Sequence, residues 1–160
     1  MPHIEKVRTQ NAQFFLYERA MHVFAESKRV GDFKATCDST ELSEEQKVTK
    51  LGQLMNESHQ SCDELYDCSS TQLNELISLC RASGSLGSRL TGAGWGGCCV
   101  SLVRKAEAAQ FIERVLEYYT KEREPGQQLW VTDDLYRYIF ATAIGRGAVV
   151  LDPQYCVWNV

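Results

Sequence analysis

The stretch SRLTGAGWGGCCVSLV, residues 88–103, decides the fold of this 160-residue chain. Its two ends are rich in residues that favour β structure, and its middle, GAGWGG at 92–97, holds four of the chain's eleven glycines. Glycine adopts positive φ angles without strain and lets another backbone approach closely. The pattern therefore predicts two strands, 86–91 and 97–103, joined by a glycine loop.

Apolar residues on both sides of this pair recur at helical spacing. They predict helices over residues 11–30, 43–55, 69–83 and 108–119. Two further short runs, 135–142 and 148–151, are predicted as strands because they combine β-compatible residues with a glycine-containing connection. Helices first, then strands with one helix among them, indicate an α+β fold: a single domain over 1–160 with a small, mostly antiparallel sheet covered on one face by helices.

Local signals set the expected ends and faces of the helices. Gly31 is expected to end the first helix, and Ser43 and Gln46 are spaced to form a capping box at the start of the second. The inward face of the first helix is predicted to carry Leu16, Ala20, Val23 and Phe24, and its wet side Glu26, Lys28 and Arg29.

Charge and hydropathy exclude several classes of protein. The net charge is −4, with the basic residues scattered, which argues against nucleic-acid binding. No apolar run is long enough for a membrane span, and the first residues, MPHIEKVRTQ, lack the apolar core of a signal peptide. A cytoplasmic protein with no membrane partner is the expectation.

The seven cysteines do not form a recognisable disulfide or zinc pattern. Their number is odd, no CxxC occurs, and Cys98 and Cys99 are adjacent. His3, His22 and His59 are isolated from any metal-ligand spacing. We expect reduced, structural thiols and no metal site.

The glycine loop fits three interpretations. Gly92, Gly94 and Gly97 satisfy GxGxxG, but strand-like CCVSLV follows where a dinucleotide site needs a helix, and no Walker A lysine ends the run. The loop is then a structural hairpin, an anion site built from backbone amides, or a point of close approach to another backbone. Trp95 is either a plug over the core or a stacking surface.

Three stretches of the sequence help to choose among these interpretations of the loop. They are RAMHVFAESKRV at 19–30, LMNESHQSCDELYDCS at 54–69 and GSRLTGAGWGGCCVSLV at 87–103. In this order they resemble the C-terminal part of galactokinases, in the GHMP kinase superfamily, over about 18–151. The form GAGWGG is most similar to eukaryotic N-acetylgalactosamine kinases and fungal galactokinases. The resemblance implies transfer of the γ-phosphoryl group of ATP, with magnesium, to the C1 hydroxyl of galactose or N-acetylgalactosamine.

The resemblance also implies which residues would face the ATP phosphates and the sugar. They are Thr91, Gly92, Ala93, Gly94, Trp95, Gly96 and Gly97. Arg89 is a secondary candidate for a phosphate, against a structural salt bridge. Asp63, Glu64 and Asp67 could suit magnesium, but we expect them on the solvated face of a helix end.

The family's N-terminal motifs GRxNLIGEHxDY and PxGxGLSSSA, and its catalytic aspartate, have no counterpart here. We therefore expect no catalytic residue in this chain, no tight binding of ATP or magnesium by it alone, and a missing N-terminal kinase domain as partner. SSTQLN at 69–74 stands where galactokinases commonly have SCPELD, which indicates a weaker helix start. The alternative is a non-catalytic galactokinase-like binding or regulatory module.

Overall fold

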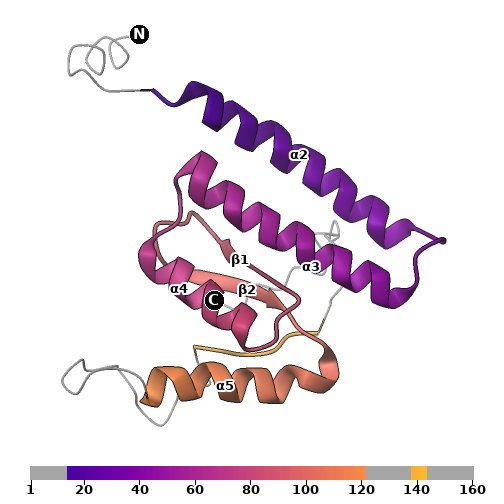
Figure 1. Cartoon of the computed structure of the whole chain (residues 1–160), viewed down its shortest axis with the longest axis vertical. Coiled ribbons are helices and arrows are strands. Elements are labelled where there is room, and N and C mark those ends of the chain that lie inside the picture. The colour runs from indigo at the N-terminus through magenta and orange to yellow at the C-terminus, as the bar shows by residue number, and fades with distance from the viewer. Residues whose placement is uncertain (1–13, 122–137, 144–160) are drawn as a thin grey trace, which may run out of the picture. The chain divides into compact units, whose positions relative to one another are not determined.

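The computed structural model describes residues 14–121 and 138–143. The chain divides into two units, Met1–Gln127 and Gln128–Val160, which are considered separately. In the first unit the elements follow the order α2 (Leu16–Asp38), α3 (Glu44–Ser61), η1 (Cys62–Tyr66), α4 (Thr71–Ala82), β1 (Gly87–Thr91), β2 (Cys98–Leu102), η2 (Lys105–Glu107) and α5 (Ala108–Lys121) (Figure 1).

The sheet of the first unit is the predicted hairpin. β1 and β2 pair antiparallel, from Gly87 opposite Leu102 at one end to Thr91 opposite Cys98 at the glycine loop. α3 contacts β1, α4 contacts both strands, and α2 lies beside α3 (Figure 1). The α+β prediction is confirmed, and both strands begin and end within one residue of their expected positions.

The predicted helix starts are confirmed by their hydrogen bonds. Ser43 Oγ accepts from the amide of Gln46 at 3.3 Å, and the Ser43 amide donates to Gln46 Oε1 at 2.9 Å, which completes the capping box. Ser70 caps α4 in the same way, accepting from the amide of Leu73 at 3.3 Å. Gly84 follows α4 with a φ of 108°, as expected of a terminating glycine.

Gly31 does not end α2, and this prediction is wrong. The helix continues for seven residues beyond it to Asp38. Two ion pairs with i,i+4 spacing support the continued helix: Lys28 with Asp32, which spans the glycine, and Lys34 with Asp38, which follows it. A glycine inside a helix costs about 1 kcal/mol relative to alanine, which such local contacts and tertiary packing offset.

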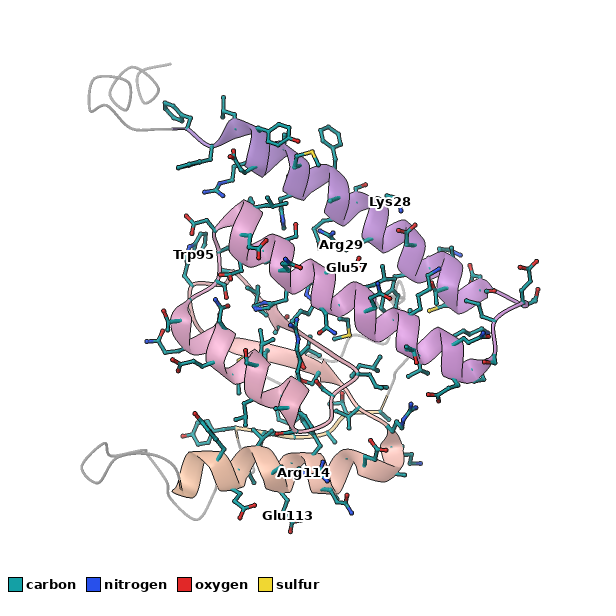
Figure 2. The ribbon with its side chains drawn as sticks, viewed as in Figure 1. Lys28, Arg29, Glu57, Trp95, Glu113 and Arg114 are labelled. Carbon is teal, nitrogen blue, oxygen red and sulfur yellow. The ribbon has the colours of Figure 1, made fainter. Side chains whose placement is uncertain are left out.

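The predicted faces of α2 are also wrong. The apolar side chains face solvent: Leu16 is 72% exposed and Phe24 76% exposed. Glu26 instead turns inward, to Ser58 of α3 and Arg89 of β1. Figure 2 shows Arg29 between α2 and α3, whereas Lys28 stays on the outer side. Because polar groups on α3 and β1 bind Glu26, the polar side of the helix is the one that packs within this unit.

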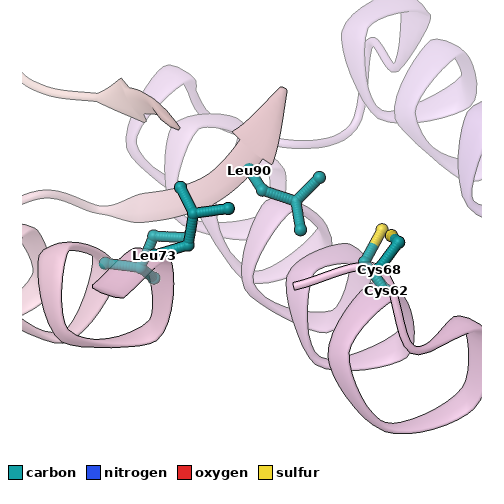
Figure 3. Packing of buried hydrophobic residues seen from close by; sticks show 5 residues of the cluster. Cys62, Cys68, Leu73 and Leu90 are labelled. Atoms are coloured by element: carbon teal, nitrogen blue, oxygen red, sulfur yellow. The ribbon is translucent and has the colours of Figure 1, made fainter. Parts of the chain in front are cut away.

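The core lies between α4, β1 and the end of α3 (Figure 3). Its buried members are Cys62, Cys68, Leu73, Ile77 and Leu90. Leu73 and Ile77, one turn apart on α4, are 2% and 1% exposed. The six described cysteines, which exclude Cys156, form no disulfide.

In the second unit the structure describes only residues 138–143. They form a turn, a bend and an irregular stretch, so this part of the strand predicted over 135–142 is wrong. Tyr138 and Phe140 are 73% and 74% exposed, and aromatic residues favour a strand only where one face packs. The strand predicted over 148–151 lies outside the described residues. Among the described helices, none is both long and apolar enough to cross a membrane.

Candidate functional site

The loop between β1 and β2 is built from left-handed backbone. Gly92, Gly94, Gly96 and Gly97 all have positive φ, and so does Trp95, at 54°. Residues other than glycine rarely adopt this backbone conformation, so the positive φ angles by themselves require glycines in the loop. Thr91, at the end of β1, and Ala93 are exposed beside it. The hairpin interpretation therefore explains why glycine stands at these four positions.

Close approach to a backbone is also observed, but to the chain's own backbone. A Cβ atom added at Gly94 would lie 2.0 Å from the carbonyl oxygen of Cys68. The same oxygen accepts a hydrogen bond of 2.6 Å from the amide of Trp95. The loop is thus seated on the segment between η1 and α4.

Trp95 does not plug the core, because 65% of it is exposed. Its indole Nε1–H donates to the carbonyl oxygen of Asp67 at 2.9 Å, which fixes the ring at the edge of the loop (Figure 2). Asp67 itself has a left-handed backbone, with φ of 61°, immediately after η1. A π-helix ending in a left-handed residue therefore presents the two carbonyl groups that hold Trp95.

Open space remains over the other glycines. A Cβ atom added at Gly92, Gly96 or Gly97 would have no neighbour within 4 Å. Close packing within the described residues therefore does not explain the glycines at these three positions. The space next to the backbone there is open. An anion site lined by backbone amides requires such open space.

A pocket of about 430 Å³ lies between the loop, β1, η1 and α2. Its lining comprises His22, Glu26, Cys62, Tyr66, Cys68, Arg89, Leu90, Gly92, Ala93 and Trp95. Three of the predicted site residues and Arg89 therefore meet there, whereas Thr91, Gly94, Gly96 and Gly97 do not line it. His22 and Tyr66, which the sequence interpretation missed, stack with ring centroids 4.6 Å apart.

Glu26 is the electrostatic centre of this pocket. It accepts hydrogen bonds from Arg29 Nε at 2.5 Å and Ser58 Oγ at 2.8 Å, and Arg89 Nη1 lies 3.6 Å from its Oε2. Burial alone raises the pKa of the Glu26 carboxyl, but these hydrogen bonds and the charges of both arginines outweigh it, so the pKa lies below its usual 4.5. Arg89 thus makes the structural salt bridge that was the alternative to a phosphate contact.

Substituting Glu26→Gln is expected to lower the free energy of unfolding by about 2 kcal/mol at pH 7. The amide would leave the charges of Arg29 and Arg89 without their carboxylate. Urea denaturation measures the effect. Glu44→Gln is the matched control, because the Glu44 side chain is 88% exposed, and its expected cost is about 0.5 kcal/mol or less. Equal costs for the two substitutions would contradict the assigned role of Glu26.

Comparing the wild type with Glu26→Gln at different pH values tests the lowered pKa of Glu26. Because the folded-state pKa of Glu26 is lowered, its stabilising contribution is present above the unfolded pKa, near 4.5, and is lost as the pH falls through the folded value. The difference in stability between the wild type and Glu26→Gln is therefore expected to shrink below about pH 4.5. A difference that stays constant down to pH 3 would contradict this direction.

The acids considered for magnesium have other partners. Asp63 accepts from Asn74 Nδ2 at 3.0 Å, Glu64 accepts from Gln60, and Asp67 pairs with Arg19 at 3.4 Å. In the part of the chain that the structure describes, no three His, Cys, Asp or Glu side chains gather as a metal site would require.

The SSTQLN segment starts its helix without the family's proline. Ser70 supplies the cap, and Asn74 bridges Asp63 and Ser69, whose Oγ donates to Asn74 Oδ1 at 2.6 Å. The weaker helix start inferred from the sequence is therefore compensated by local hydrogen bonds, and it gives no physical ground for inferring a loss of activity.

The α+β unit with its glycine loop matches a known family model, GHMP kinases C terminal, over residues 39–121. The chain therefore belongs to the C-terminal domain family of the GHMP kinases. Among curated proteins it is 36% identical over 159 residues to the galactokinase of Dictyostelium discoideum, covering 91% of this chain and 31% of that protein. It is 44% identical over 108 residues to the galactokinase of Saccharomyces cerevisiae, covering 67% of this chain and 20% of that protein.

A solved structure gives the same relationship. The galactokinase of Lactococcus lactis, determined in complex with galactose, superposes with a TM-score of 0.57 at 28% identity, covering 76% of this chain and 30% of that one. The chain thus spans less than a third of the length of each of these three relatives.

Proposed function

We propose that this chain is the C-terminal domain of a galactokinase-type sugar kinase. In the longer protein, ATP would phosphorylate galactose or N-acetylgalactosamine at the C1 hydroxyl, in the cytoplasm. The observation that carries the proposal is the glycine loop, open over three glycines and beside a pocket, in a chain whose relatives are galactokinases. Residues 1–160 would act as one domain of that protein, galactokinase-like over about 18–151.

Phosphoryl transfer requires neutralised phosphates, a positioned hydroxyl and an orienting carboxylate or base. This chain would supply only the first in part, through the backbone amides of Gly92, Gly96 and Gly97 on the open side of the loop. ATP with magnesium would supply the phosphoryl group when bound. Because Arg89 is engaged by Glu26, we assign the phosphate contact to the loop amides, and Arg89 holds the loop's strand to α2.

The missing N-terminal kinase domain is the proposed partner, and α2 provides the surface for it. One side of the helix exposes Leu16, Tyr17, Val23, Phe24 and Val30. Each is between 57% and 76% exposed, so the side forms an apolar stripe along about four turns of the helix. A helix whose polar side packs inward and whose apolar side faces out is suited to burial against a further domain.

The isolated chain is therefore expected to bind an apolar dye such as 1-anilinonaphthalene-8-sulfonate through this stripe. Replacing Leu16 and Phe24 together by Gln should reduce the dye fluorescence. The matched control is Val100→Gln on β2, another exposed apolar residue at 46% exposure, which should change it little. Unchanged fluorescence in the α2 variant, or no dye binding by the wild type, would contradict the proposed interface.

The activity itself is tested by comparing two preparations. The purified 160-residue chain is expected to transfer no phosphate from radiolabelled ATP to galactose or N-acetylgalactosamine, because it lacks the groups that orient the acceptor. The native protein, captured from its source cells with an antibody against residues 107–127, is expected to phosphorylate one of these sugars. Phosphate transfer by the isolated chain would overturn the proposal that its active site is incomplete. Inactivity of the captured protein would favour the non-catalytic module.

A further inference from the structure

Two cysteines, Cys62 and Cys68, lie together in the buried core cluster (Figure 3). Cys62 begins η1 and Cys68 follows its end, and the amide of Cys68 donates to the carbonyl oxygen of Cys62 at 2.9 Å. Their sulfur atoms lie next to each other in Figure 3, and the residues are 5% and 4% exposed. The turn therefore holds two thiols together that are six positions apart in the sequence.

A route from solvent reaches this pair. Cys62 and Cys68 both line the pocket of about 430 Å³, which is large enough for a small organic molecule. Cys80 and Cys99 form a second contact between thiols, from α4 to β2, but neither lines this pocket. Its position beside the pocket thus distinguishes the Cys62–Cys68 pair from the Cys80–Cys99 contact.

We propose that Cys62 and Cys68 are a modification site that forms a reversible disulfide when a low-molecular-weight disulfide, RSSR, enters the pocket. One protein thiolate attacks a sulfur of RSSR, forming a mixed disulfide and releasing RS⁻. The second cysteine attacks the protein-bound sulfur, which forms the Cys62–Cys68 bond and releases the other RS⁻. The two protein thiols lose two protons and two electrons, and RSSR is reduced to two RSH.

The environment of Cys62 sets the order of attack. Burial, and then the charge of a Cys68 thiolate, raise the pKa of the Cys62 thiol to about 11, against a lowering by Arg89. At neutral pH Cys62 is then almost entirely protonated and a poor first nucleophile. Cys68 is the expected attacker, and Cys62 resolves the mixed disulfide.

The Cys62–Cys68 disulfide would form in the segment to which the glycine loop is hydrogen-bonded. The carbonyl oxygen of Cys68 accepts from the amide of Trp95, and the neighbouring carbonyl oxygen of Asp67 accepts from its indole. A covalent link between Cys62 and Cys68 restrains this segment from one side while the loop is bound to it on the other. The modification site therefore adjoins the loop without using any loop residue.

The test treats the reduced, folded chain with 2-hydroxyethyl disulfide, followed by an acid quench and alkylation. Exposed Cys37 and Cys98 can form mixed disulfides with the reagent, so the readout is the linkage of each cysteine and not the number of free thiols. Peptide mapping should recover Cys62 linked to Cys68, and dithiothreitol should restore all seven thiols. Cys62 and Cys68 left as free thiols, mixed disulfides alone, or a link between Cys80 and Cys99 instead, would overturn the proposal.

Variants make the assignment specific. Cys68→Ser is expected to abolish the internal disulfide, and Cys37→Ser, at an exposed cysteine near the end of α2, should leave the Cys62–Cys68 link unchanged. Circular dichroism checks that each variant is folded. If Cys68→Ser does not fold, the peptide map of the wild type alone still decides, because it identifies the two linked residues.

Discussion

Replacing Gly94 by alanine is expected to destabilise the chain by about 3 kcal/mol or more. The new Cβ atom would lie 2.0 Å from the carbonyl oxygen of Cys68, and the φ of 84° would be strained for alanine. Relieving the clash requires the loop to move off its seat, which breaks the bond from the Trp95 amide to Cys68. Urea denaturation gives the change in the free energy of unfolding.

Gly92→Ala is the matched control for this substitution. Gly92 has a similar φ of 80°, but nothing lies within 4 Å of an added Cβ atom there. Only the conformational cost of about 1–2 kcal/mol is expected. A larger effect at Gly92 than at Gly94 would contradict the seating of the loop on Cys68.

Gly52→Ala is expected to lower the free energy of unfolding by about 3 kcal/mol, because it disrupts the contact between α3 and β1. A Cβ atom at Gly52 would lie 2.4 Å from the carbonyl oxygen of Leu86, and one at Gly87 would lie 2.1 Å from the carbonyl oxygen of Gly52. The two backbones touch with no side chain between them, so neither can yield without moving the helix from the strand.

Gly31→Ala is expected to have the opposite effect on stability. Gly31 lies inside α2, and nothing lies within 4 Å of its added Cβ atom. Alanine should therefore stabilise the chain by about 0.5–1 kcal/mol through helix propensity. Destabilisation by Gly31→Ala, or a neutral Gly52→Ala, would contradict the packing described for α2 and α3.

The hairpin, the start of α3 and the extent of α4 could be predicted because each depends on local signals. The capping box at Ser43 and the terminating glycine at Gly84 are set by neighbouring residues, and the apolar spacing of α4 matches one buried face. These elements need no knowledge of their partners, so their positions follow from sequence alone.

The orientation of α2 could not be predicted in this way. Apolar spacing indicates which side chains share a face, not whether that face is covered within the chain. The inward turn of Glu26 depends on Ser58 and Arg89, which are 32 and 63 positions away. For the same reason the pocket residues His22 and Glu26 gave no local signal, except that Glu26 and Arg29 are spaced for a helical ion pair.

For the glycine loop, the sequence predicted its place between the two strands but not the separate contacts of its glycines. The seat of Gly94 on Cys68 joins positions 26 apart, and only the structure distinguishes it from the open positions at Gly92 and Gly96. The hairpin interpretation applies to all four glycines, and close approach to a backbone applies to Gly94 in addition. The third, an anion at the open amides, remains part of the proposed function.

If this chain is one part of a larger sugar kinase, as proposed, the native polypeptide must be much larger than the chain itself. An immunoblot of the source cells with the antibody against residues 107–127 gives the size of the native polypeptide. We expect a band far above the 18.1 kDa of this chain, since the chain spans 31% of its Dictyostelium relative. A single band at 18.1 kDa would contradict the proposal and indicate a free-standing, non-catalytic relative.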